Sequence, residues 1–224
     1  MAILRRLSGA RFAAKSGLLW LFVASVLATL SGCTSYAVGV KHNRELLSRI
    51  TAASVLWLPN DKIKVHVIRT RPLASAPVYS KDPKETMYEY RERIYEYSEP
   101  VVVTEEDKRL AGNNTQRIMR LFSTRVGAQL EQALAAKKVA LRPSGSPGIA
   151  EIHITPSSGQ TECVPLGCND SLWMQVSVLV GPERKEAWSA RIRAGTSWPG
   201  EIGEVMVKDF ADTLTKNLQD SGLI

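Results

Sequence analysis

Side chains able to carry out acid–base or nucleophilic chemistry are scarce in this sequence. Its three histidines are His42, His66 and His153, and the last two stand in alternating stretches that place them on the polar side of a strand. There is no G-x-S-x-G turn, no phosphate-binding glycine loop and no H-E-x-x-H motif. We therefore predict that the protein is not an enzyme and has no catalytic residue, no metal site and no cofactor.

One cysteine stands directly after an N-terminal leader. Four basic residues, the last of them Lys15, precede an apolar run from Leu18 to Leu30, and Cys33 follows. A charged end, an apolar middle and small residues at the cut are typical of a secretory signal peptide. The run is shorter than the roughly 20 residues of a spanning helix. The pair Arg5-Arg6 leaves twin-arginine export as an alternative to general secretion.

The four residues Leu30-Ser31-Gly32-Cys33 resemble the lipobox of bacterial lipoproteins. The resemblance implies removal of a signal peptide at residues 1–32, a diacylglycerol thioether on Cys33 and an acylated new N-terminus, with palmitate as a typical chain. Two or more acyl chains make such an attachment effectively permanent. Thr34, where an inner-membrane lipoprotein would have aspartate, implies an outer-membrane location, and we expect the protein to face the periplasm.

The other two cysteines are predicted to form a disulfide. With Cys33 assigned to lipid, Cys163 and Cys168 remain as an even pair in an oxidising compartment. The four residues between them include Pro165 and Gly167, which suit a tight turn. A redox pair or half of a metal site is the alternative, although a redox motif normally has two intervening residues.

The charge of the mature chain gives no support for a nucleic-acid partner. Without residues 1–32 the chain has 192 residues, with 25 basic against 22 acidic side chains and a net charge of +3. A chain of this length accommodates one domain with a substantial core. It has no long basic run, zinc-finger spacing or aromatic RNA-binding motif, so we predict no nucleic-acid partner.

We divide the mature chain into a lipidated tether, residues 33–61, and an α/β domain, residues 62–224. The alternation at residues 63–67 predicts the first strand. A charged, tyrosine-rich insertion follows at residues 72–112, as either a helix or an edge hairpin. Tyrosine and arginine are enriched at binding hot spots, although a solvated insertion is the alternative. The candidate partner-binding residues are Tyr88, Tyr90, Arg91, Tyr95 and Tyr97.

Two amphipathic helices and three strands are predicted in the rest of the domain. The first helix begins at residues 113–115, and its apolar stripe is Ile118, Phe122, Val126, Leu130 and Leu134. The second ends the chain, with the stripe Ile202, Met206, Phe210, Leu214 and Leu218. Alternation over residues 150–155, 172–180 and 188–194 predicts an antiparallel meander between them. The polar face of the whole sheet, including the first strand, would carry side chains that are net basic: Lys64, His66, Glu151, His153, Gln175, Arg191 and Arg193.

The predicted fold class is α+β. We expect a single mixed four-stranded sheet, with the order strand-helix-strand-strand-strand-helix, both helices on one face and the insertion after the first strand. A lipobox followed by this order resembles the lipoprotein partner of the lipopolysaccharide translocon and the auxiliary lipoproteins of ABC-type envelope transport systems. The resemblance covers residues 62–222 as an order of elements and implies no binding residue.

We therefore expect a lipid-anchored envelope protein that works by contact. It would be an accessory or partner-binding component of an envelope transport or assembly system, attached to the membrane by its lipid and bound to another envelope protein. The alternative function is a periplasmic binder of a small anionic or lipidic ligand.

Overall fold

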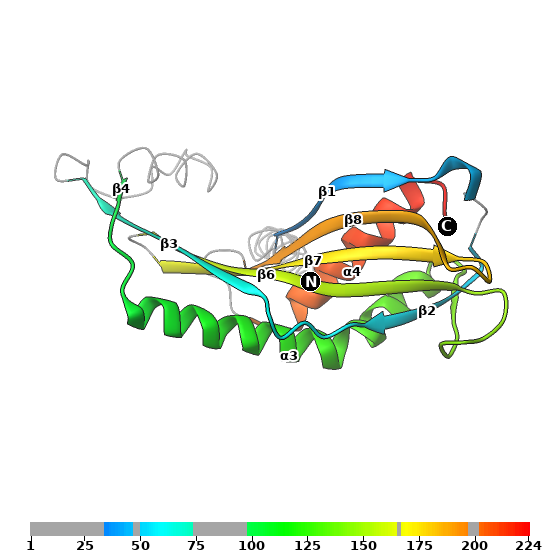
Figure 1. Ribbon diagram of the computed structural model, residues 1–224, viewed down its shortest axis with the longest axis horizontal. Helices are drawn as coiled ribbons and strands as arrows, with labels where there is room; N and C mark the ends of the chain where they lie inside the picture. Colours follow the sequence, from blue (N-terminus) through cyan, green and yellow to red (C-terminus); the bar gives the residue numbers. More distant parts are fainter. Residues whose placement is uncertain (1–33, 47–49, 74–97, 165–166, 197–201) are drawn as a thin grey trace, which may run out of the picture. The chain divides into compact units, whose positions relative to one another are not determined.

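The fold is built around β6 (Ala150–Val164), a 15-residue strand with partners on both sides (Figure 1). The computed structural model describes residues 34–46, 50–73, 98–164, 167–196 and 202–224, all within a unit that extends from Cys33 to Ile224. An antiparallel series leads from β6 to one edge of the sheet. It consists of β7 (Gly167–Val180), β8 (Lys185–Gly195) and β1 (Thr34–His42).

On its other side, β6 pairs in parallel with two strands in succession. β2 (Ala52–Trp57) lies along its first part and β3 (Lys64–Pro72) along its second. Two short strands extend the sheet: β5 (Ala140–Leu141) pairs with β2, and β4 (Ser98–Pro100) pairs with β3. The short 3-10 helix η1 (Arg44–Leu46) follows β1. The sheet is mixed, as predicted, because β3 and β6 are parallel strands joined through a helix.

Helix α3 (Glu105–Ala135) begins at a capping box. Thr104 Oγ1 accepts a hydrogen bond from the Asp107 amide at 3.1 Å, and Asp107 Oδ2 accepts one from the Thr104 amide at 2.9 Å. The box satisfies two amides that the helix leaves free, so it fixes the start. The predicted start at residues 113–115 is therefore wrong, and residues 105–112, predicted as part of the insertion, are helical.

The second helix, α4 (Glu204–Asp220), packs with α3 on one face of the sheet. The predicted stripe of α3 is buried from Ile118 to Leu134, and that of α4 is buried from Met206 to Leu218. Phe122 of α3 meets Phe210 of α4 edge to face, with ring centroids 5.4 Å apart. These helices and the apolar sides of β6, β7 and β8 form one core. The other face carries no helix among the described residues, and we call it the open face.

The predicted four-stranded sheet is too small, because the described residues alone form a sheet of eight strands. β1 and β2 lie within residues 33–61, so the predicted tether is mostly part of the domain. β4 and β5, of three and two residues, are too short to give any periodic pattern. The α+β class, the mixed sheet and the two helices are confirmed.

No helix in the described ranges combines the length and the apolar character that crossing a membrane requires.

Candidate functional site on the open face of the sheet

Four side chains on the open face form a cluster that we call the aromatic–arginine patch. They are Tyr36 of β1, Trp173 of β7, and Arg191 and Arg193 of β8. Tyr36, Arg193 and Trp173 are direct partners across three adjacent strands, and the period of two along β8 puts Arg191 on the same face. The patch is thus a product of strand register, which residue spacing alone does not determine.

The rings and guanidinium groups of the patch contact one another. Tyr36 meets Trp173 edge to face, with ring centroids 5.6 Å apart, so the two rings reach across β8. The Arg191 guanidinium lies 4.9 Å from the centre of the Trp173 ring, and that of Arg193 lies 5.8 Å from the Tyr36 ring. Both distances fit cation–π attraction. The patch therefore holds two cations in place without using a carboxylate.

Gly195, at the end of β8, makes room for Arg193. A Cβ atom at this position would lie 2.9 Å from Arg193 Nη1. The guanidinium thus lies over bare backbone as well as beside the Tyr36 ring.

The open face is positive along the cross-strand row that contains Arg193. Lys64 of β3 lies in the same cross-strand row as Arg193, through Ser158 and Trp173. Neither Arg191 nor Arg193 has an ion pair with any residue that the structure describes. An anion approaching this row would meet two guanidinium groups that form no ion pair with the acids of the described ranges.

One end of the open face carries an acid that is already neutralised. Glu151 of β6 is 9% exposed, and its Oε2 accepts hydrogen bonds from the Arg184 guanidinium and lies 3.1 Å from His153 Nε2. The bond from Arg184, followed by that with His153, holds the pKa of Glu151 below its usual value. A cavity of about 520 Å³ beside it is lined by residues 144–149 and the turn after β7.

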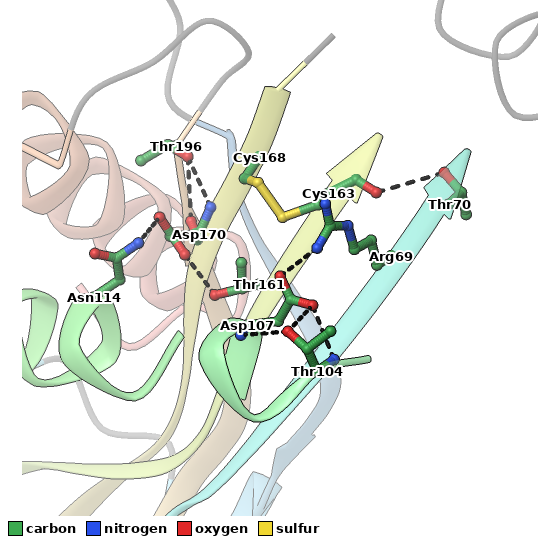
Figure 2. The surroundings of a disulfide bond; sticks show 10 residues. All are labelled: Arg69, Thr70, Thr104, Asp107, Asn114, Thr161, Cys163, Cys168, Asp170 and Thr196. Atoms are coloured by element: carbon green, nitrogen blue, oxygen red, sulfur yellow. Dashed lines mark hydrogen bonds and ion pairs between the residues drawn. A yellow bond between two sulfur atoms is a disulfide. The ribbon is translucent and has the colours of Figure 1, made fainter. Parts of the chain in front are cut away.

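The disulfide end of the sheet is held together by side chains from four elements, β3, β6, β7 and α3 (Figure 2). Cys163 and Cys168 are bonded and face each other across β6 and β7, with Cα atoms 4.0 Å apart. The predicted disulfide is confirmed. Arg69 of β3 forms a 2.6 Å ion pair with Asp107 in the first turn of α3. The bonds from the Thr104 amide and from Arg69 lower the pKa of Asp107 to about 2.

A second carboxylate at this end is buried without a cation among the described residues (Figure 2). Asp170 is 8% exposed; Thr161 donates to its Oδ1 at 2.5 Å and Asn114 donates to its Oδ2 at 2.9 Å. Its backbone amide donates to Thr196 Oγ1. Burial raises the pKa of Asp170, and the two side-chain bonds only partly oppose that shift.

The predicted site residues fall in different parts of the chain. Cys33 and the candidate contact residues Tyr88, Tyr90, Arg91, Tyr95 and Tyr97 lie outside the described residues. The residues predicted to share a polar face do share the open face by register, from Lys64 on β3 to Arg193 on β8. They divide into the positive row and the Glu151 end described above. Within the described parts of the chain, no three His, Cys, Asp or Glu side chains are placed to hold a metal ion.

Sequence reasoning missed Tyr36, Trp173 and Asp170 as members of these clusters. Tyr36 lies in a stretch predicted as tether, although its alternation with Val38 and Val40 is a strand signal. Asp170 has no signal at all in the sequence, because its partners come from α3, β6 and the end of β8.

The fold and the site define an α+β domain with one covered and one open sheet face. No family model matches the sequence, and no curated protein resembles it at a significant level. The chain is similar in structure to a PelC dodecamer from Paraburkholderia phytofirmans, with 10% identity over 81% of this chain and 96% of that chain, and a TM-score of 0.38. It also resembles protein XCC0632 from Xanthomonas campestris, described with the family model DUF330, with 10% identity over 79% of this chain and 93% of that chain, and a TM-score of 0.27. These TM-scores are too low to support an argument about function.

Proposed function

We propose that this chain is a bacterial outer-membrane lipoprotein, anchored through Cys33, that works by contact and not by catalysis. Residues 1–32 would be its signal peptide, and the mature domain would face the periplasm. In this proposal the protein is an accessory or partner-binding component of an envelope transport or assembly system.

One observation carries the proposal: the domain starts where the predicted cleavage would leave the new N-terminus. The unit of the fold runs from Cys33 to Ile224, and β1 begins at Thr34. A cut before Cys33 would therefore remove none of the strands that the structure describes. The backbone amide of Ser35 already donates to Asp209 of α4 at 2.6 Å, so the chain joins the packed domain two residues after the lipid.

The experiment that tests the anchor is intact-mass spectrometry of the full-length protein expressed with its own leader, beside Cys33→Ser. We expect the wild type to have lost residues 1–32 and gained a diacylglyceryl group and an amide-linked acyl chain. Cys33→Ser should keep its leader and carry no lipid. A wild-type protein with a free thiol at Cys33, or one that retains Met1, would refute the proposal.

The partner would be sought with the same lipidated protein. The predicted contact residues are the four tyrosines and Arg91 within residues 88–97, and alanine at all five should abolish recovery of an envelope transport component after cross-linking. Unchanged recovery would exclude this segment as the contact surface. Alanine at Arg117 and Arg120, which are exposed on α3, is the control.

The alternative function, binding of a small anionic or lipidic ligand, is favoured by the aromatic–arginine patch. Arginine recognises phosphate and carboxylate groups with paired hydrogen bonds, and aromatic rings lie well against apolar or ring-shaped groups.

A further inference from the structure

The aromatic–arginine patch lies very near the residue that the proposed function assigns to the lipid. Tyr36 is the third residue after Cys33, and an extended chain advances at most about 3.6 Å per residue, so their Cα atoms are no more than ~11 Å apart. The headgroup layer on each side of a bilayer is roughly 5–8 Å thick. A lipid on Cys33 would therefore keep Tyr36 within reach of the headgroups.

Strand register brings the rest of the patch to the same place. Arg193 is the direct partner of Tyr36 on β8, and Trp173 is the partner of Arg193 on β7. Because neighbouring strands are about 4.8 Å apart, the whole patch spans roughly 10 Å of the sheet. Val38 and Val40, which are 39% and 40% exposed, continue β1 beyond it.

The residue types of the patch match those that proteins place at a membrane surface. Tyrosine and tryptophan are enriched at headgroup level because one end of each ring is apolar and the other polar. Arginine binds phosphate oxygens in pairs, and each cation near an anionic leaflet adds to the attraction. Lys64 extends this positive strip to β3.

The acids of the open face leave this strip positive. Glu151 is bonded to Arg184, and Glu186 accepts hydrogen bonds from Ser177 and Ser189 at the far end of β7 and β8. Glu162 lies on the open face near the disulfide end and is engaged in an interaction of its own. Among the described residues, the positive charge therefore follows the row from Arg193 to Lys64, between Glu162 on one side and Glu151 on the other.

We propose that the aromatic–arginine patch binds the phosphates of anionic phospholipid headgroups in the leaflet that holds the lipid anchor. The open face then lies against the membrane surface, with α3 and α4 on the side away from it. This inference rests on the proposed lipidation of Cys33 and adds an orientation to it.

The test is the accessibility of a single added thiol in the lipidated, full-length protein. Val38→Cys lies on the open face opposite Arg191, and Gln116→Cys lies on the exposed side of α3. Each variant is reconstituted into vesicles of phosphatidylcholine with or without phosphatidylglycerol, and its labelling by a membrane-impermeant maleimide is compared with that in detergent. We expect at least tenfold slower labelling of Val38→Cys in the anionic vesicles and an unchanged rate for Gln116→Cys.

Removal of the two cations tests the chemistry of the contact. Adding Arg191→Gln and Arg193→Gln to Val38→Cys should restore labelling to nearly the rate in detergent, because each arginine near an anionic surface contributes about a fivefold factor. Arg117→Gln with Arg120→Gln on α3 removes the same charge and should leave the protection intact. Circular dichroism of every variant establishes that it is folded.

The outcomes separate the two proposals. Equal labelling of Val38→Cys in vesicles and detergent, from protein that floats with the vesicles, would overturn the orientation and leave the lipid anchor standing. Equal protection in both vesicle types would overturn the recognition of anionic headgroups. Protein that fails to float would overturn both proposals.

Discussion

At the scale of single residues, Asp170 is the most unusual side chain that the structure describes. A carboxylate that is buried without a cation costs folding free energy, and hydrogen bonds recover only part of it. Thr161 and Asn114 supply those bonds from a strand and a helix. Asp170 therefore links α3 to the hairpin of β6 and β7. The folding free energy that this link costs depends on whether the carboxyl group is protonated.

The pH dependence of stability should reveal this cost. Because folding raises the pKa of Asp170 above its unfolded value of about 3.8, the folded state binds more protons between the two values. The free energy of unfolding contributed by this group is therefore greatest below pH 3.8 and falls as the pH rises through the raised pKa. We expect the wild type to lose stability relative to Asp170→Asn over this window, as measured by urea unfolding from pH 3.5 to 7.

A second variant tests the direction of the pKa shift at Asp170. Thr161→Val removes a bond that favours the charged carboxylate, so it should extend the window to higher pH. Parallel pH profiles for the wild type and Asp170→Asn would contradict the account.

What the sequence could predict at this scale was the apolar core. Ile118, Phe122 and Leu130 repeat at the period of a helix, and all are buried as expected. Tyr36 and Asp170 could not be placed in their clusters, because their neighbours are distant in sequence and are chosen by strand register. The disulfide could be predicted, since Cys163 and Cys168 lie close together in the chain.

At the scale of elements, the ends of the helices show where local signals suffice. Gly222 has a φ of 75°, and the Leu223 amide donates to the Leu218 carbonyl at 3.0 Å, so α4 ends in a left-handed glycine cap of the kind that a Gly-Leu pair after an apolar stripe indicates. The predicted start of α3 is wrong because the cap formed by Thr104 and Asp107 lies within a charged run. Charge and composition alone assign that run to the insertion, although the cap is also a local signal. The edge strands β4 and β5 are defined by their pairing with β3 and β2, and no local sequence pattern predicts them.

The cap of α3 should make a measurable contribution to stability. Replacing Thr104 by alanine removes the acceptor for the Asp107 amide and should lower the free energy of unfolding by about 1 kcal/mol. Thr104→Ser keeps the hydroxyl and should recover most of the loss. Chemical denaturation followed by far-ultraviolet circular dichroism measures both. If serine and alanine are equally destabilising, the cap is not the cause.

At the scale of the whole molecule, α3 and α4 share one core with the sheet. Phe122 and Phe210 are fully buried and in contact, and Trp57 stacks on Phe122 at a centroid distance of 6.2 Å. The indole of Trp188 donates to Ser221 Oγ just after α4. A core with such shared contacts should unfold in one transition.

We expect Phe122→Ala and Phe210→Ala each to lower the free energy of unfolding by about 3–5 kcal/mol, because each leaves a cavity in a packed interior. Tryptophan fluorescence and circular dichroism should report the same midpoint. Leu110→Ala, at a position that is 49% exposed, should change stability by less than about 0.5 kcal/mol. Separate transitions for the two probes would mean that the helices are held independently.

The pairing of β1 with β8 also limits when the sheet can fold. The first strand of the domain, β1, pairs with residues 188–195. β2 and β3 pair with β6, so they cannot be paired before β6 has been synthesised. A chain emerging from its N-terminus therefore cannot close this sheet until nearly all of it has been delivered, and such distant pairings slow folding. If Cys33 is lipidated as proposed, a chain that is still open during synthesis or passage through a translocon would leave Cys33 accessible to an acylating enzyme before β1 pairs with β8.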